Sequence, residues 1–173
     1  AGWFWRKSAP LRLNGAVVVD TLVDVVSKNG NLLLNVGLRP DGTLPQKQRN
    51  VLVELGEWLD VNGEAIFGSR PWEVFGEGPT EIKGGHFNER TVDSEPFKAQ
   101  DIRFTTQEET LYAIALAWPE SGALQIKSLG TDSDHDVGPI ESVELLGTEH
   151  LLDWERDEEG LTVHFPDEKP CDH

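Results

Sequence analysis

The sequence has 173 residues and a formal net charge of −16, from 31 acidic and 15 basic residues. This length allows one ordinary domain or two small ones, with a core large enough to fold unaided. The acidic excess argues against nucleic acid and against an anionic membrane surface, because both are bound by clustered Lys and Arg. No apolar run approaches the roughly 18 residues that a membrane-spanning helix needs.

The first predicted element is a helix over residues 16–27. Apolar Val18, Leu22, Val25 and Val26 recur there at helical spacing, with Asp20 and Asp24 on another face. Because these two carboxylates stand four residues apart, we expect them to repel each other. Asn29-Gly30 then ends the helix.

A strand is predicted next, over residues 31–36. This short apolar run is bounded by turn residues, which is typical of a strand buried on both faces. Pro40-Asp41-Gly42 forms a turn, and Thr43 is expected to cap the following helix with Pro45 in its first turn. The apolar face of that helix contains Trp58, and Asn62-Gly63 ends it.

The remainder of the chain has the pattern of short antiparallel strands separated by Gly, Asp and Pro clusters, as in a β-sandwich. The predicted strands span residues 66–75, 102–106, 110–118, 124–129, 140–146 and 161–165. We therefore predict an α+β chain in two parts: a helix-strand-helix unit over 1–65 and a sandwich over 66–173. One strand between two helices is the unit of a parallel α/β sheet or barrel, and its edges need partners.

Two stretches resemble a known family. The block GNLLLNVGLRPDGTLPQKQRNVLVELGEWLDVNGEAIFGSRPW, residues 30–72, resembles the end of the catalytic barrel in α-L-fucosidases of glycoside hydrolase family 29. The later AQDIRFTTQEETLYAIALAWP, residues 99–119, resembles their C-terminal β-sandwich. The resemblance implies that this chain is the terminal βα portion of a (β/α)8 barrel followed by an antiparallel β-sandwich that lacks its last strand.

The same resemblance implies where a sugar would bind. Active sites lie at the C-terminal ends of barrel strands, so Asn35, Arg39 and the loop over residues 38–44 are candidate substrate-binding residues. Aromatic Trp3 and Trp5 are further candidates, because aromatic faces stack on the C–H surfaces of sugars. Leu38 departs from the family, whose members often have proline there.

The catalytic residues are a separate matter. The family hydrolyses α-L-fucosides with retention, using a nucleophile and an acid/base about 5 to 5.5 Å apart. In the family both lie upstream of the stretch that this chain resembles, and no position here matches either. Asp41 is the first candidate within the chain, against the interpretation that it only stabilises its own turn. We predict no cofactor and no metal site.

Several readings stay open at this stage. The chain starts at Ala1 and contains no methionine, so we expect it to be a processed chain or a piece of a longer protein, truncated at both ends. It is then the C-terminal part of an α-L-fucosidase that acts on fucosylated oligosaccharides or glycoconjugates. The alternatives are a non-catalytic carbohydrate-binding or scaffold sandwich, and a site rebuilt across a homo-oligomer from residues such as Asp41.

Partners and location complete the expectations. Unpaired strand edges predict a homo-oligomer, or association with a missing N-terminal half. The family resemblance points to a secreted or periplasmic enzyme, although no signal-peptide pattern occurs in these residues. The single cysteine, Cys171, excludes an internal disulfide.

Overall fold

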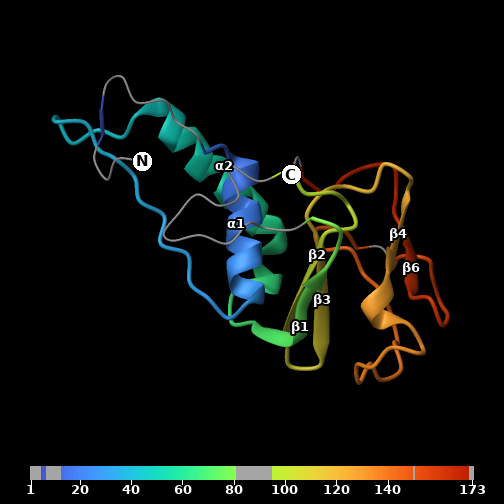
Figure 1. Ribbon diagram of the computed structural model, residues 1–173. Helices are drawn as coiled ribbons and strands as arrows, with labels where there is room; N and C mark the ends of the chain where they lie inside the picture. Colours follow the sequence, from blue (N-terminus) through green and yellow to red (C-terminus); the bar gives the residue numbers. More distant parts are fainter. Residues whose placement is uncertain (1–4, 7–12, 81–94, 150, 172–173) are drawn as a thin grey trace.

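The computed structural model describes residues 5–6, 13–80, 95–149 and 151–171, and within them the elements form three layers (Figure 1). Helices α1 (Gly15–Ser27) and α2 (Gln46–Asn62) make the first layer. The middle sheet has the order β1-β2-β3, and the outer sheet has the order β4-β6-β5. These strands are β1 (Arg70–Glu77), β2 (Ile102–Gln107), β3 (Thr110–Ala115), β4 (Ala123–Ile126), β5 (Trp154–Arg156) and β6 (Leu161–His164).

Helix α1 confirms the first prediction. Asn14 caps it, since the side-chain oxygen accepts a hydrogen bond from the Val17 backbone N–H at 2.9 Å. At the other end Asn29 has a φ of 61°, and the Gly30 N–H donates to the Val25 carbonyl, so the chain turns away as predicted. The buried face is shifted from the predicted one, because Val19 and Val23 are buried while Val25 and Val26 are only half-buried.

Helix α2 is also confirmed, although its start is not as predicted. Its N-cap is Pro45, whereas Thr43 was expected to cap it. The reason is local, because the Thr43 hydroxyl donates to the carboxylate of Asp41 at 2.7 Å and is not available to the helix. Trp58 is buried against α1, and the carboxylate of Glu54 accepts the Gly15 N–H, so the two helices are joined by packing and by a polar contact.

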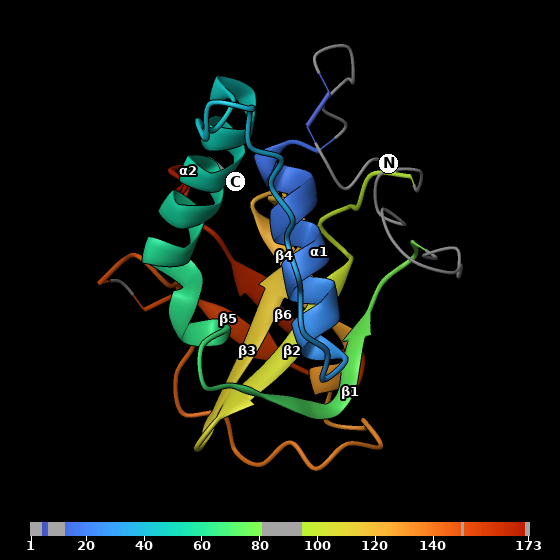
Figure 2. The ribbon, with the colours of Figure 1, turned by 90° about the vertical axis from the view of Figure 1, so that its left-hand side faces the viewer.

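Residues 31–36 form no strand, which corrects the prediction of a strand buried on both faces. They run along the helices on the side away from the sheets, as Figures 1 and 2 agree. Leu33 is 87% exposed, while Leu32, Leu34 and Val36 are half-buried. A strand exists only through hydrogen bonds to a neighbour, and no strand among the described residues pairs with this segment.

The antiparallel pairing predicted for the second half is confirmed, with changes in several strands. The predicted strand 66–75 begins only at Arg70, after the 3-10 turn Gly63–Ala65, and predicted 110–118 and 124–129 end at Ala115 and Ile126. Residues 140–146 contain only one bridge, between Glu144 and Leu151. Their place in the outer sheet is taken by β5, which was missed because three residues are too short for an alternating pattern to be visible.

The central strand of the middle sheet, β2, is buried on both faces, whereas β1 and β3 are mostly half-buried or exposed. Its side chains alternate between the two faces, as in any strand. Ile102 and Phe104 pack into one cluster with residues of the outer sheet. On the opposite face, Arg103 bonds to α1 and the Thr105 hydroxyl donates to the Ala65 carbonyl at 2.7 Å. Strand β2 is therefore the element through which the helices and the outer sheet are joined.

No helix in the described part of the chain has the length and apolar character that crossing a membrane requires.

Candidate functional site

The loop after residues 31–36 carries most of the predicted site residues. Its turn is closed by two backbone bonds of 2.9 Å, from the Gly42 N–H to the Arg39 carbonyl and from the Arg39 N–H to the Thr43 carbonyl. Gly42 has a φ of 81°, a left-handed conformation that glycine adopts without strain. The predicted Pro40-Asp41-Gly42 turn is thereby confirmed, and the loop has a defined shape.

Asp41 lies in this turn as an exposed residue. One oxygen of its carboxylate accepts both the Thr43 hydroxyl and the Thr43 N–H, at 2.7 and 2.9 Å. These two bonds, the side-chain one first, hold the pKa of Asp41 below its usual value. Such a carboxylate stays ionised at neutral pH, which makes it unsuited to donate a proton. The geometry fits the turn-stabilising interpretation of Asp41.

Arg39 is tied into the same loop. Its Nη1 donates to the Thr43 hydroxyl at 3.1 Å and to the Leu44 carbonyl at 3.4 Å. One turn into α2, the Gln48 side-chain oxygen accepts the Gly37 N–H at 2.9 Å. The loop is therefore anchored to the helix at one point and braced internally at another.

Trp5 contacts this loop at Gly37. A Cβ built on Gly37 would lie 2.8 Å from the Trp5 backbone nitrogen, so the two backbones are in direct contact. Asn35 is exposed two residues before Gly37. The structure thus gathers Trp5, Asn35, Arg39 and Asp41 around one loop, whereas predicted Trp3 lies outside the described residues.

The contact between Gly37 and the Trp5 backbone leads to a testable prediction. Replacing Gly37 with alanine forces a Cβ against the backbone of Trp5, which cannot rotate away as a side chain would, so we expect a loss of about 1–3 kcal/mol in the free energy of unfolding. Gly56→Ala is the matched control, because that glycine lies inside α2 with open space around it. The free energy of unfolding of the control should rise by about 0.5–1 kcal/mol. Urea unfolding measures both variants. Equal changes in the free energy of unfolding for Gly37→Ala and Gly56→Ala would contradict a close contact between Gly37 and Trp5.

A shallow cavity of about 430 Å³ lies elsewhere, lined by Thr131, Arg156, Asp157, Glu158 and Glu159. Arg156 is the one cationic group in it, and its guanidinium donates to four backbone carbonyls, of Leu129, Gly130, Val137 and Gly138. The arginine is therefore occupied in holding the surrounding loops together. We assign no ligand to this cavity.

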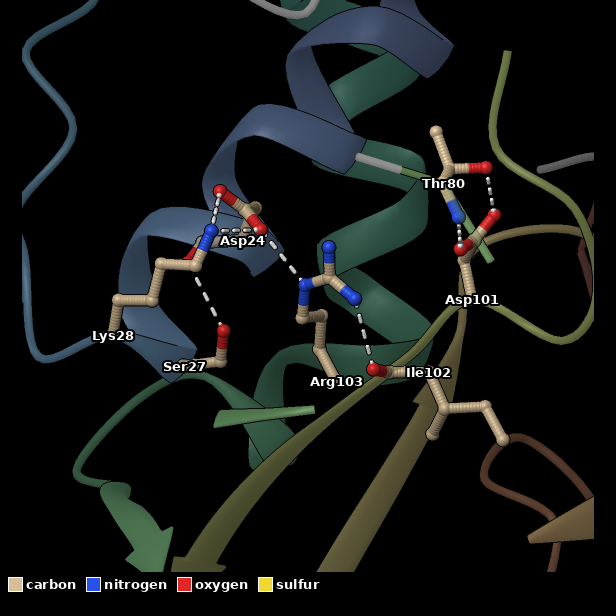
Figure 3. Close-up of polar contacts among 7 residues, drawn as sticks. All are labelled: Asp24, Ser27, Lys28, Thr80, Asp101, Ile102 and Arg103. Carbon is tan, nitrogen blue, oxygen red and sulfur yellow. Dashed lines mark hydrogen bonds and ion pairs between the residues drawn. The ribbon is translucent and has the colours of Figure 1, made fainter. Parts of the chain in front are cut away.

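A second group of polar residues is buried between α1 and β2 (Figure 3). One Asp24 oxygen accepts Arg103 Nε and Lys28 Nζ, each at 2.7 Å. Arg103 is only 4% exposed. Its guanidinium also lies over the rings of Phe75 and Phe97, with centroid distances of 5.5 and 5.4 Å. The expected repulsion between Asp20 and Asp24 is thus not the main interaction of Asp24, which is neutralised by two cations.

Asp101 is the other buried carboxylate in this region, and it is fully buried. Its oxygens accept the Thr80 N–H at 2.9 Å, the Thr80 hydroxyl at 2.7 Å and the Lys98 N–H at 2.7 Å. Sequence reasoning missed both Asp101 and Arg103. The available signal was the sequence DIRFTTQ, in which an arginine interrupts an otherwise apolar and hydroxylic strand.

Within the described ranges, no group of three or more His, Cys, Asp or Glu side chains is arranged to hold an ion.

Comparisons with known proteins agree with one another. A family model described as "Alpha-L-fucosidase" matches residues 1–64, and one described as "Alpha-L-fucosidase C-terminal domain" matches residues 95–173. The tissue alpha-L-fucosidase of Mus musculus is 32% identical over 98% of this chain and 33% of its own length. The protein from Homo sapiens is 30% identical, over 97% of this chain and 31% of its own length.

Solved structures give the same result. The crystal structure of Thermotoga maritima alpha-fucosidase in complex with a mechanism-based inhibitor is 31% identical, with a TM-score of 0.72. The match covers 95% of this chain and 33% of that one. The chain therefore spans about a third of the length of the relatives that it matches.

Proposed function

The chain belongs to the α-L-fucosidase family, and from that premise we propose that it serves as the C-terminal part of a retaining α-L-fucosidase that releases L-fucose from fucosylated glycans. In this proposal residues 1–65 complete the catalytic barrel and residues 66–173 form the β-sandwich domain. The carboxylates that break the glycosidic bond are supplied from outside these residues.

The observation that carries the proposal is the exposure pattern of residues 31–36. Asn31, Leu33 and Asn35 are exposed, and Leu32, Leu34 and Val36, which alternate with them, are half-buried. Such alternation is that of an extended chain with one covered face. Helices α1 and α2 lie on one side of the segment (Figure 2), as helices lie outside the strands of a (β/α)8 barrel. The exposed face would then point into the barrel.

This placement also assigns a role to the loop with Asn35, Arg39 and Trp5. It follows the C-terminal end of the proposed strand, which is the end where barrel enzymes bind their substrates. Arg39 and Asn35 offer hydrogen-bond donors for sugar hydroxyls, and Trp5 offers an aromatic face. Asp41 keeps the turn in shape and takes no part in the chemistry.

A chimera tests the proposal. In it, this chain replaces the aligned third of the Thermotoga maritima protein. We expect the chimera to hydrolyse 4-nitrophenyl α-L-fucoside, and we expect this chain alone and the Thermotoga maritima protein without its aligned third to be inactive. A folded chimera without activity would contradict the proposal. If this chain alone bound L-fucose while the folded chimera stayed inactive, the function would be that of a non-catalytic carbohydrate-binding module.

Asp41→Asn in the chimera separates the two interpretations of Asp41. Loss of a catalytic carboxylate costs about 10²–10⁴-fold in rate, whereas loss of a turn contact should change kcat by less than about threefold. We expect the small effect. A large loss in a chimera that retains its thermal stability would mean that Asp41 acts in the reaction.

A further inference from the structure

The loop over residues 37–44 holds its shape by itself. The Gly42 N–H donates to the Arg39 carbonyl, and the Arg39 N–H donates to the Thr43 carbonyl. The Asp41 carboxylate accepts both donors of Thr43, and Arg39 Nη1 donates to the Thr43 hydroxyl. All of these bonds join residues of the same loop. They fix its internal geometry, and they do not determine where it lies on the molecule.

The position of the loop is set by helix α2. At its C-terminal end the loop continues into Pro45, the N-cap of α2, whose carbonyl accepts the Gln48 and Arg49 N–H groups at 3.0 Å each. At its N-terminal end the Gly37 N–H donates to the Gln48 side-chain oxygen at 2.9 Å. Among the described residues, Gln48 is the only one outside the loop that hydrogen-bonds to it. Both ends of the loop are thus attached to the first turn of one helix.

The N-cap explains why Gln48 bonds to a residue so far away in the sequence. Gln48 is the third residue of α2, and a glutamine at this position can accept the backbone N–H of its own N-cap residue. The N-cap here is Pro45, and proline has no N–H to donate. The Gln48 oxygen is therefore available to Gly37, which lies eleven residues earlier in the chain.

No neighbour of Gln48 on α2 duplicates this contact. The Gln46 side chain donates to the Asn50 side chain at 2.7 Å, and both of these residues are exposed. Lys47 and Arg49 are also exposed, and their side chains carry no acceptor for an N–H group. Gln48 is half-buried, as expected for a side chain that is fixed against the loop.

We propose that Gln48 is a positioning residue of the fucosidase reaction: its side chain locks the loop over residues 37–44 onto α2, so that loop and helix form one rigid unit that holds Asn35 and Arg39 in place for the sugar. This inference rests on the proposed function, since it takes this loop to be the one that binds substrate. Gln48 acts through the Gly37 backbone and contacts neither the sugar nor a reacting atom.

Loss of the anchor should affect substrate binding more than chemistry. The loop offers hydrogen-bond donors to the sugar and carries no reacting carboxylate, and removal of such uniform binding raises KM without lowering kcat. In the chimera, we expect Gln48→Leu to raise KM for 4-nitrophenyl α-L-fucoside by about tenfold, the equivalent of one hydrogen bond, and to change kcat by less than about threefold.

Two further variants show whether the side-chain acceptor is the cause. Gln48→Glu keeps an oxygen that accepts the Gly37 N–H, so it should restore KM to within about threefold of wild type. Gln46→Leu is the matched control, because it makes the same change on an exposed residue of the same helical turn. Its KM should equal that of wild type.

Amide hydrogen exchange tests the anchor in the full 173-residue chain, where no activity is needed. We expect the Gly37 amide to exchange about tenfold faster in Gln48→Leu, and at the wild-type rate in Gln48→Glu and Gln46→Leu. The Arg39 and Gly42 amides bond inside the loop. Their exchange should stay within about threefold of wild type in every variant, because the loop shifts without unfolding.

Each result decides one part of the inference. Unchanged exchange at Gly37 in Gln48→Leu would overturn the anchor, and an equal loss of protection at Arg39 and Gly42 would overturn the rigid unit. In an active chimera, a wild-type KM for Gln48→Leu, or no recovery of KM in Gln48→Glu, would overturn the positioning role. A folded but inactive chimera would contradict the proposed function instead, and the exchange data would still decide whether Gln48 sets the position of the loop.

Discussion

Replacing Arg103 with methionine is expected to lower the free energy of unfolding by about 3–5 kcal/mol, the cost of breaking a buried ion pair from one side. Methionine fills a similar volume between Phe75 and Phe97 and removes the charge. Asp24 is then left buried with Lys28 as its only cation among the described residues. Because domains of this size are stable by only about 5–15 kcal/mol, the variant should be close to unfolding.

Urea unfolding measures this effect, and Arg49→Met is the matched control because Arg49 is exposed on α2. The control should change stability by less than about 0.5 kcal/mol. Combining Arg103→Met with Asp24→Asn should recover part of the loss, since the second change removes the uncompensated charge. A loss below about 1 kcal/mol for Arg103→Met, or no recovery in the double variant, would contradict the role of this pair.

Replacing Asp101 with alanine is expected to have the second large effect, lowering the free energy of unfolding by about 3–5 kcal/mol. The change removes three charge-assisted hydrogen bonds of a fully buried carboxylate and leaves the Thr80 and Lys98 N–H groups without this partner. Asp101 binds residues on both sides of the connection between β1 and β2, so its loss should also free both ends of that connection. Asp153→Ala, on an exposed aspartate, is the control.

Asp101→Asn makes the test sharper. Asparagine keeps one acceptor oxygen and removes the charge. The free energy of unfolding of Asp101→Asn should therefore lie between the values for wild type and Asp101→Ala. Urea unfolding gives the three stabilities, and amide exchange at Thr80 and Lys98 reports the freed ends. Equal stability of wild type and Asp101→Ala would show that these hydrogen bonds do not hold the connection.

The helices could be predicted because their signals are local. Asn29-Gly30 as a stop and the apolar face with Trp58 follow from neighbours in the sequence. The Asn14 cap is just as local, but it was not predicted. The prediction of a strand over residues 31–36 was wrong for the opposite reason. Apolar composition made it look like a strand, but strand pairing depends on a partner elsewhere, and no described residue supplies one.

The same distinction holds for the candidate site. The turn at Asp41 was predictable because the side chain bonds to Thr43, two residues away. The contact of Trp5 with Gly37 and the bond between Arg103 and Asp24 join residues far apart in the sequence, and a single sequence carries no record of them. Long-range polar contacts of this kind hold the helices, and with them the proposed substrate loop, onto the sheets.

The central claim is that residues 31–36 become a barrel strand once the rest of an α-L-fucosidase surrounds them. Amide exchange at Leu32, Leu33 and Leu34 tests it directly, in this chain as a monomer verified by light scattering and in the chimera described above. We expect these amides to exchange freely in the chain alone and to be strongly protected in the active chimera. Strong protection in the monomeric chain, or free exchange in an active chimera, would contradict the claim.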